Sequence, residues 1–312
     1  DQNLILLDQA TIFNASHLFG FLSIYNADAI RDMKLYKGGM PARYGGRISS
    51  VLDVYQKDGN NTQYHGTGGI GSLSSRFLLE GPIVKDKSSF LIGGRASYAH
   101  LFLKLTDNDN SAYFYDLNMK LHTQVDEQNS LYLSGYFGRD VFDLSQAFSN
   151  SYGNTLVNLR WNHLFSDQLF SNLSLVYSDY YYGMKIDLSG FKWDSWIRNA
   201  NLLYDFKHYL SDNFKLGYGL QGTYYDFAPG VITPFGTSTI NYKALPHKYA
   251  LELGLYAEAE HKLSESLTLS YGLRWSSFYH LGKRSMPQYL RDQAVLFHPL
   301  QRIYQRGIPI GE

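Results

Sequence analysis

The feature that most constrains this 312-residue sequence is a strict alternation of apolar and polar residues, which begins near residue 63. The segments 214–221, 249–260 and 267–276 show the alternation most regularly, and shorter stretches at 116–122 and 157–162 share it. Successive side chains of a β-strand point to opposite faces of the sheet, so this pattern predicts strands with one apolar and one polar face.

The alternating segments predict about eleven strands. Many of them exceed the length of about 5–6 residues that is most common in soluble proteins, and a tilted strand crosses a bilayer in about 9–11 residues. The expected strands are 63–72, 75–83, 89–98, 112–124, 129–140, 154–165, 168–183, 195–210, 213–228, 247–263 and 267–280.

The connections between these segments alternate in length. Short polar turns are expected at 84–88, 125–130, 166–168, 211–213 and 264–266, and longer links near 100–112, 142–154, 183–195, 228–246 and beyond 280. Outer-membrane barrels have such short turns at one end and long loops at the other. We therefore predict a membrane all-β fold, an antiparallel up-and-down β-barrel. The alternative is a soluble sandwich or propeller, which needs shorter strands with turns every 8–12 residues or so.

An odd number of strands is unexpected for such a barrel. Single-chain bacterial barrels have even strand numbers, and an open sheet edge in lipid leaves backbone groups unsatisfied. Eleven is half of about 22, the size class of plugged outer-membrane transporters. We expect residues 63–312 to form the N-terminal half of such a transmembrane barrel.

Residues 1–62 differ from the rest because they lack the long alternation. They read as a small α+β unit, with strands at 4–8 and 50–59 and a helical turn near 26–32. A unit of this size is too small for a strong core of its own. We expect it to be the C-terminal portion of a plug domain inside the barrel.

Composition excludes several classes of function. Lys+Arg and Asp+Glu both number 28, which gives no support to nucleic-acid binding, and the chain has no cysteine for disulfides or thiol chemistry. No run of about 18 apolar residues exists, which excludes a membrane-spanning helix. The ten histidines lack metal-ligand spacing, and no Ser, His and Asp set has the sequence context of a nucleophile. The glycine-rich segment 66–71 lacks the following helix that a nucleotide site requires. We expect no enzyme activity, cofactor or metal.

The segment KGGMPARYGGR, residues 37–47, is the first candidate site. Glycine permits a tight turn here, from which Arg43 and Arg47 are expected to point to the barrel wall and meet inward carboxylates. The alternative is that both arginines are simply solvated in the lumen, since exposed ion pairs contribute little. The residues predicted to couple plug and barrel are Arg43, Tyr44, Gly45, Gly46, Arg47, Glu252, Glu258 and Glu260.

Aromatic residues gather at the expected long-loop end of the strands, with seven in residues 177–196. They are read either as the aromatic girdle at a membrane interface or as a surface that stacks on a substrate. The candidates for substrate contact are Tyr180, Tyr181, Tyr182, Trp193, Trp196, Tyr224 and Tyr225.

Three stretches carry a family resemblance. LLDQATIFNASHLFGF (6–21), the segment from NADAIRD to VYQKDG (26–59) and YHGTGGIGSLSSRFLLEGPI (64–83) together resemble the late plug and first barrel strands of TonB-dependent outer-membrane receptors, most closely those of Bacteroidetes. The resemblance covers residues 1–100 by motif and the rest by strand pattern.

The resemblance implies a function and a location. It implies TonB-dependent active transport of a large or scarce nutrient across the outer membrane of a Gram-negative bacterium. The implied partners are TonB, through an N-terminal segment absent from this sequence, the outer-membrane lipid and an imported ligand. A surface lipoprotein or other outer-membrane subunits remain open as partners. The alternative function is a structural or interaction barrel subunit of an outer-membrane surface complex.

Overall fold

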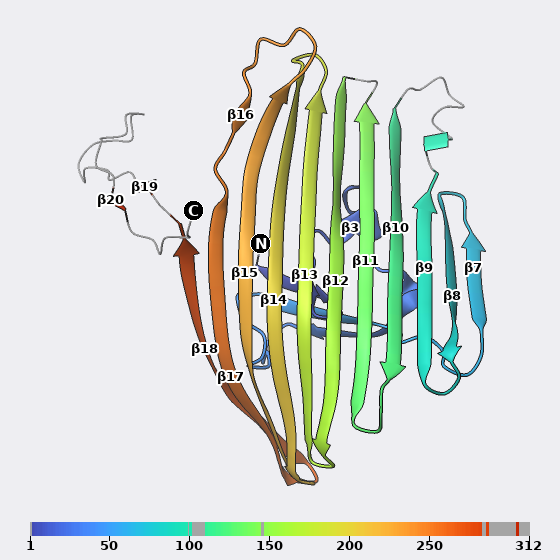
Figure 1. Ribbon diagram of the computed structural model, residues 1–312, viewed down its shortest axis with the longest axis vertical. Helices are drawn as coiled ribbons and strands as arrows, with labels where there is room; N and C mark the ends of the chain where they lie inside the picture. Colours follow the sequence, from blue (N-terminus) through green and yellow to red (C-terminus); the bar gives the residue numbers. More distant parts are fainter. Residues whose placement is uncertain are drawn as a thin grey trace.

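The computed structural model describes residues 2–98, 100–101, 110–144 and 147–282, and the backbone of 285–286 and 304–305. Its main feature is one large antiparallel sheet whose strands follow chain order, with a smaller unit lying against one face (Figure 1). No helix among the described residues has the length and apolar character that crossing a membrane requires.

The large sheet, here called the wall, runs from β7 to β18, and each strand pairs antiparallel with the next along its path. Its strands are β7 (His65–Ile70), β8 (Ser74–Val84), β9 (Ser88–Ser97), β10 (Ser111–Gln124), β11 (Asn129–Leu144), β12 (Phe148–Ser166), β13 (Leu169–Ile186), β14 (Phe191–Ser211), β15 (Phe214–Pro234), β17 (Lys248–Ser264) and β18 (Leu267–Leu281). The short β16 (Lys243–Ala244) pairs with β15, and β19 (Ser285–Met286) pairs with β20 (Tyr304–Gln305). The expected up-and-down membrane β-barrel wall is confirmed.

Two expected long links are wrong. Where a loop is expected near 142–154, β11 continues to Leu144 and β12 begins at Phe148. Where a loop is expected near 183–195, β13 continues to Ile186 and β14 begins at Phe191. Near this end of the strands the apolar alternation fades, although the backbone ladder between the strands continues. The expected link beyond 280 lies largely outside the described residues.

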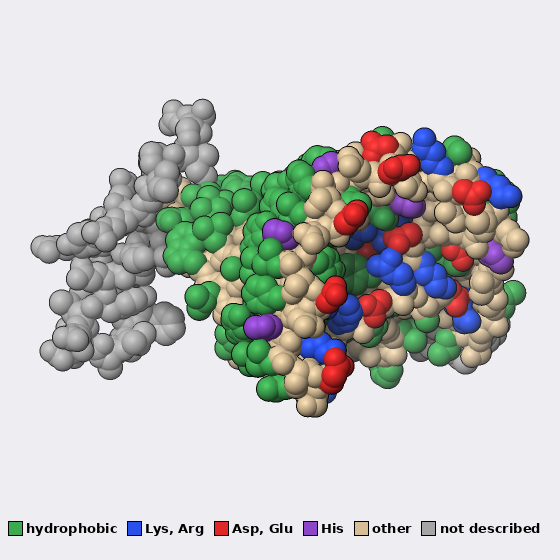
Figure 2. Space-filling view, turned by 90° about the horizontal axis from the view of Figure 1, so that it is seen from below, with side chains coloured by type: hydrophobic (Ala, Val, Ile, Leu, Met, Phe, Trp, Pro, Cys, Tyr) green, Lys and Arg blue, Asp and Glu red, His purple; other side chains and the backbone are tan. Residues whose placement is uncertain are grey.

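The two faces of the wall have opposite character. Apolar side chains on one face are exposed, including Leu175 at 52%, Leu255 at 53% and Leu273 at 83%. Polar side chains of the other face, such as Asn118 and Ser174, are almost fully buried. Seen from the end with the short turns, hydrophobic side chains cover the outside and charged ones gather over the middle (Figure 2). This is the reverse of a soluble protein and fits a wall with lipid outside and a polar lumen.

Residues 2–62, here called the N-terminal unit, fold on the polar face of the wall. Their elements are β1 (Asn3–Leu7), β2 (Ala10–Thr11), β3 (Ser16–His17), the 3-10 helix η1 (Leu18–Gly20), β4 (Leu22–Ser23), the 3-10 helix η2 (Ala27–Ala29), β5 (Ile30–Tyr36) and β6 (Ser50–Gln56). The order β2-β1-β6-β5 places parallel strands β1 and β6 at the centre of a small sheet. Asn26 caps η2 by accepting from the amide of Asp28, at the position where the sequence predicts a helical turn.

The N-terminal unit shares its core with the wall. Leu7, Ile24 and Val54 pack in one buried cluster with wall residues that include Leu156 and Val176. The unit contacts the wall from β8, where Arg76 donates to Asp28, to β18, where Arg274 donates to Arg43. The wall therefore bends around the unit, which depends on it for a hydrophobic core.

Candidate functional site

Residues 37–47 form a loop that contacts the far end of the wall. Arg274 on β18 donates from Nη1 to the carbonyls of Arg43, at 3.0 Å, and Ala42, at 3.4 Å. Its Nη2 also donates to Gln221 Oε1 at 3.0 Å. A Cβ at Gly45 would collide with the Arg274 guanidinium. The missing Cβ of Gly45 therefore leaves the space that the Arg274 guanidinium occupies in this arrangement.

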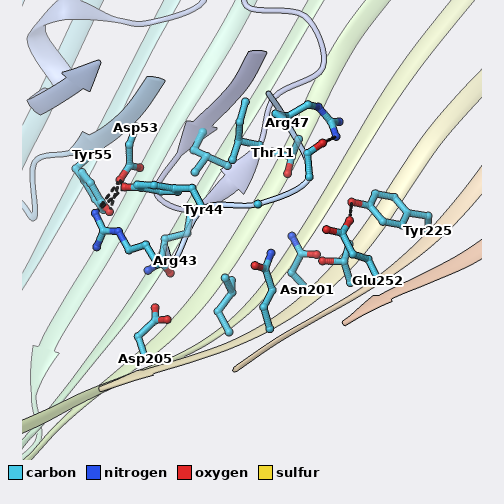
Figure 3. Close-up of a pocket in the computed structure, with 18 residues that line it drawn as sticks. Thr11, Arg43, Tyr44, Arg47, Asp53, Tyr55, Asn201, Asp205, Tyr225 and Glu252 are labelled. Carbon is cyan, nitrogen blue, oxygen red and sulfur yellow. Dashed lines mark hydrogen bonds and ion pairs between the residues drawn. The ribbon is translucent and has the colours of Figure 1, made fainter. Parts of the chain in front are cut away.

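The side chain of Arg43 turns back into its own unit. Its Nη2 donates to the Tyr44 hydroxyl at 2.6 Å and lies 3.8 Å from Asp53 Oδ2, while Tyr44 and Tyr55 donate to that same oxygen at 2.6 and 2.7 Å (Figure 3). Asp53 is buried on β6, so these groups together stabilise an otherwise isolated carboxylate. Burial and the Asp53 charge raise the pKa of both tyrosines, so the phenols stay protonated and donate.

The expected ion pairs between loop arginines and wall glutamates are not formed among the described residues. The link from Arg43 to Glu258 is a backbone one, from N to Oε2 at 3.4 Å. Arg47 donates to the carbonyl of Gly46 at 2.7 Å, and Glu252 accepts instead from Tyr225 at 3.0 Å. The expectation failed because face alternation places the carboxylates correctly but says nothing about where a loop arginine turns.

Glu260 lies apart from the loop. It forms an exposed pair with Lys215 at 2.8 Å near the short turns. Of the three glutamates predicted to couple plug and barrel, Glu252 and Glu258 lie next to the loop. Glu260 instead accepts from Lys215 of the neighbouring strand β15.

Three adjoining cavities, which share some of their lining residues, lie between the N-terminal unit and strands β11 to β18. The upper cavity is lined by Phe13, Gly46, Arg47, Tyr225, Phe227, Glu252, Ser276, Ser277 and Phe278. The middle cavity, drawn in Figure 3, encloses about 750 Å³ including space open to solvent. It shares Arg47 and Tyr225 with the upper cavity, and Arg43 and Tyr55 with the lower one.

The lower cavity, toward the short turns, is rich in charge of both signs. Its charged lining residues are Arg31, Asp32, Lys34, Arg43, Asp58, Arg160, Asp205, Lys207 and Glu258. The polar atoms Arg43 Nε and Arg160 Nε have no protein partner. Such groups need water or a polar solute, so this side of the unit is hydrophilic.

Two buried ionic clusters, which the sequence analysis did not identify, join the unit to the wall. The histidine cluster consists of His17 with Arg95, Asp116 and Asp140. The lysine cluster consists of Lys120 with Asp8 and Asp58. The available signal was the charge of Asp116, Lys120 and Asp140 at inward positions of otherwise alternating strands.

The aromatic candidates divide between the two faces. Tyr180, Tyr182, Trp193 and Tyr225 share the strand face that meets the N-terminal unit, whereas Tyr181, Trp196 and Tyr224 are on the outer face. The ring of Tyr180 lies 6.2 Å from that of Phe13. On the outside, the rings of Tyr181 and Trp196 lie 5.8 Å apart. The inner set can meet a solute, and the outer set fits an interfacial girdle.

No protein-family model matches the sequence, and no curated protein matches it either. Solved structures do resemble its fold. The siderophore receptor PirA from Pseudomonas aeruginosa aligns with a TM-score of 0.63 at 18% identity, covering 89% of this chain and 48% of that one.

Two other solved structures resemble it equally well. The copper transporter OprC aligns at TM-score 0.69 and 13% identity over 90% of this chain and 48% of its own. The alcaligin outer-membrane receptor FauA from Bordetella pertussis aligns at 0.67 and 13% over 90% and 47%. The chain thus spans about half the length of these receptors and transporters and shares their fold.

Proposed function

We propose that this chain forms part of an outer-membrane transporter that imports a scarce nutrient, with TonB supplying the energy. Residues 1–62 act as the plug and residues 63–312 as the first half of the barrel wall, and further strands close the lumen. The observation that carries the proposal is a polar inner face occupied by a folded unit inside a wall whose outer face is apolar. A passive pore has no use for such an obstruction.

The upper cavity is the proposed entry site for the ligand. It combines the aromatic rings of Tyr225, Phe227 and Phe278 with the charges of Arg47 and Glu252. Aromatic faces with a few polar groups suit a flat or chelated ligand. The solved structures of similar fold include siderophore receptors and a copper transporter, so ferric siderophores and copper(II) are the first ligands to test.

The plug is proposed to move rather than to leave as a whole. Beside the middle and lower cavities its contacts to the wall include the hydrogen bonds from Arg274 to the Arg43 carbonyl and from the Arg43 amide to Glu258. A pull on the segment that precedes residue 1 would act directly on β1, the central strand of the small sheet. We propose no covalent chemistry in this cycle.

The test is uptake in a strain in which the full-length protein is the sole route for each ligand, compared with the same strain lacking TonB. Energised transport predicts growth on one of the ligands that is lost without TonB. Equal growth in both strains would indicate a passive pore. Loss of a surface complex on deletion, with no TonB-dependent uptake of any ligand, would favour the scaffold function instead.

A further inference from the structure

The imidazole of His17 is enclosed by acidic groups of the wall. Nδ1 lies 2.7 Å from Asp140 Oδ2 and Nε2 lies 3.1 Å from Asp116 Oδ2. The His17 side chain is 2% exposed, and its ring stacks on Phe114 with centroids 4.1 Å apart. A carboxylate only accepts hydrogen bonds, so both ring nitrogens have a partner only when both carry a proton.

Charge balance leads to the same protonation state. Asp116 also accepts from Arg95, at 2.9 Å from Nε and 2.5 Å from Nη2. Two carboxylates and one guanidinium leave one negative charge, which a doubly protonated His17 neutralises. Burial lowers the pKa of His17, but the hydrogen bonds and charges of Asp116 and Asp140 outweigh it and raise the pKa above its ordinary value.

The Tyr136 hydroxyl lies 3.4 Å from Nε2, and among the described residues it is the one further titratable group within hydrogen-bond distance of the ring. The Tyr136 hydroxyl can donate to Nε2 only when Nε2 has lost its proton. In that state the Asp116 carboxylate faces a nitrogen that no longer donates to it.

The segment that follows His17 is held in a strained form. Leu18 and Phe19 have φ values of +49° and +58°, which residues other than glycine rarely adopt. Their amides donate to Asp140 Oδ1 at 2.8 Å and to the Tyr152 hydroxyl at 3.0 Å. The segment thus keeps an unfavourable backbone because the wall binds it, and it is ready to relax when that binding weakens.

We propose that His17 positions residues 16–21 on the wall as a proton-dependent latch, closed when the imidazole is doubly protonated and open when it is not. The sign follows from the contacts. A histidine that gains acidic partners on docking has a higher pKa in the docked form than in the undocked form. Its stabilisation of the docked form is complete below the pKa of the undocked form, and it is lost as the pH rises through the pKa of the docked form. The latch goes beyond the proposed transport function and does not depend on it.

The experiment is hydrogen–deuterium exchange of the folded protein in detergent micelles from pH 5.5 to 9, with rates normalised to the intrinsic rate at each pH. For the wild type we expect protection of the Leu18 and Phe19 amides to fall as the pH rises, with a one-proton profile whose midpoint lies above 6.5. His17→Gln should lower protection at acidic pH by about 100-fold or more and remove the profile, because it leaves a buried charge uncompensated.

Two further variants separate the latch from simple packing. Asp140→Asn keeps an acceptor for Leu18 but removes one charge, so the midpoint should move to lower pH. His247→Gln removes an exposed histidine that pairs with Asp226 at 2.8 Å, and should leave the profile unchanged. A flat wild-type profile, or an unshifted midpoint in Asp140→Asn, would overturn the proposal even if His17→Gln failed to fold.

Discussion

Lys120 Nζ lies 3.1 Å from Asp8 Oδ1, and these two side chains, 1% and 3% exposed, join the wall to the N-terminal unit. The same ammonium contacts Asp58 at 3.0 Å and the carbonyl of Gln56 at 3.1 Å. Lys120 therefore meets both the end of β1 and the end of β6. A single wall residue thus contacts the ends of both central strands of the unit.

The first prediction concerns Lys120→Met. The change leaves Asp8 as an uncompensated buried charge, so docking of the unit should weaken by about 3–5 kcal/mol. Exchange protection of the β1 and β6 amides measures it. The control is Lys215→Met, which breaks an exposed pair at 2.8 Å and should leave docking of the unit close to wild type. Equal small effects in both variants would mean that other partners stabilise the Asp8 carboxylate when Lys120 is replaced.

The second prediction tests the orientation of the wall with two substitutions on β13. Leu175 is exposed on the outer face, and Leu175→Arg should reduce stability in lipid vesicles by about 2–4 kcal/mol. Asn172→Arg on the inner face points into the hydrated lower cavity and should change stability little. Denaturant unfolding in vesicles reports both values. A larger loss of stability for Asn172→Arg than for Leu175→Arg would contradict the assignment of the Leu175 face to lipid.

The sequence predicts the wall well because its signal is local. Leu267, Leu269, Tyr271 and Leu273 repeat every second residue, so face and strand follow from neighbours along the chain. The signal is weaker at the upper ends of β11 and β12, since apolar and polar residues no longer alternate strictly there although the ladder continues to Leu144.

The contacts of the N-terminal unit were not predictable in this way. His17 meets Asp140 across 123 residues, and no periodicity connects them. Arg43 was expected to reach a wall glutamate but lies against Tyr44 and near Asp53, because a fully buried carboxylate close in sequence competes more strongly than a half-buried one on the wall. Faces can be predicted from alternation, whereas partners depend on how the loop turns.

The third prediction concerns Gly59, which lies where the unit meets β9. Its φ is +83°, and a Cβ there would lie 2.4 Å from the carbonyl oxygen of Phe90. Gly59→Ala should therefore cost more than about 3 kcal/mol, from strain together with a backbone clash. Gly39 has φ +57° with nothing within 4 Å, so Gly39→Ala should cost about 1–2 kcal/mol from strain alone. Denaturant midpoints compare the two, and equal costs would show that β9 yields at Phe90.

The last prediction uses adjacent tyrosines on opposite faces of β15. Tyr225 lines the upper cavity and donates to Glu252 at 3.0 Å, whereas Tyr224 lies on the outer face with its ring 6.1 Å from that of Tyr249. If the ligand enters through the upper cavity, Tyr225→Ala should weaken apparent uptake affinity by about tenfold or more, and Tyr224→Ala should leave it near wild type.

The readout for this pair is the concentration dependence of TonB-dependent growth on whichever ligand supports it. Tyr225→Phe separates the two contributions of the side chain, because it keeps the ring and removes the donor to Glu252. Retained affinity in Tyr225→Phe would assign the effect to stacking, and its loss would assign it to the position of the Glu252 carboxylate. Equal affinities for the two alanine variants would move the entry site away from β15, since the substitutions are chemically identical and differ in the face they alter.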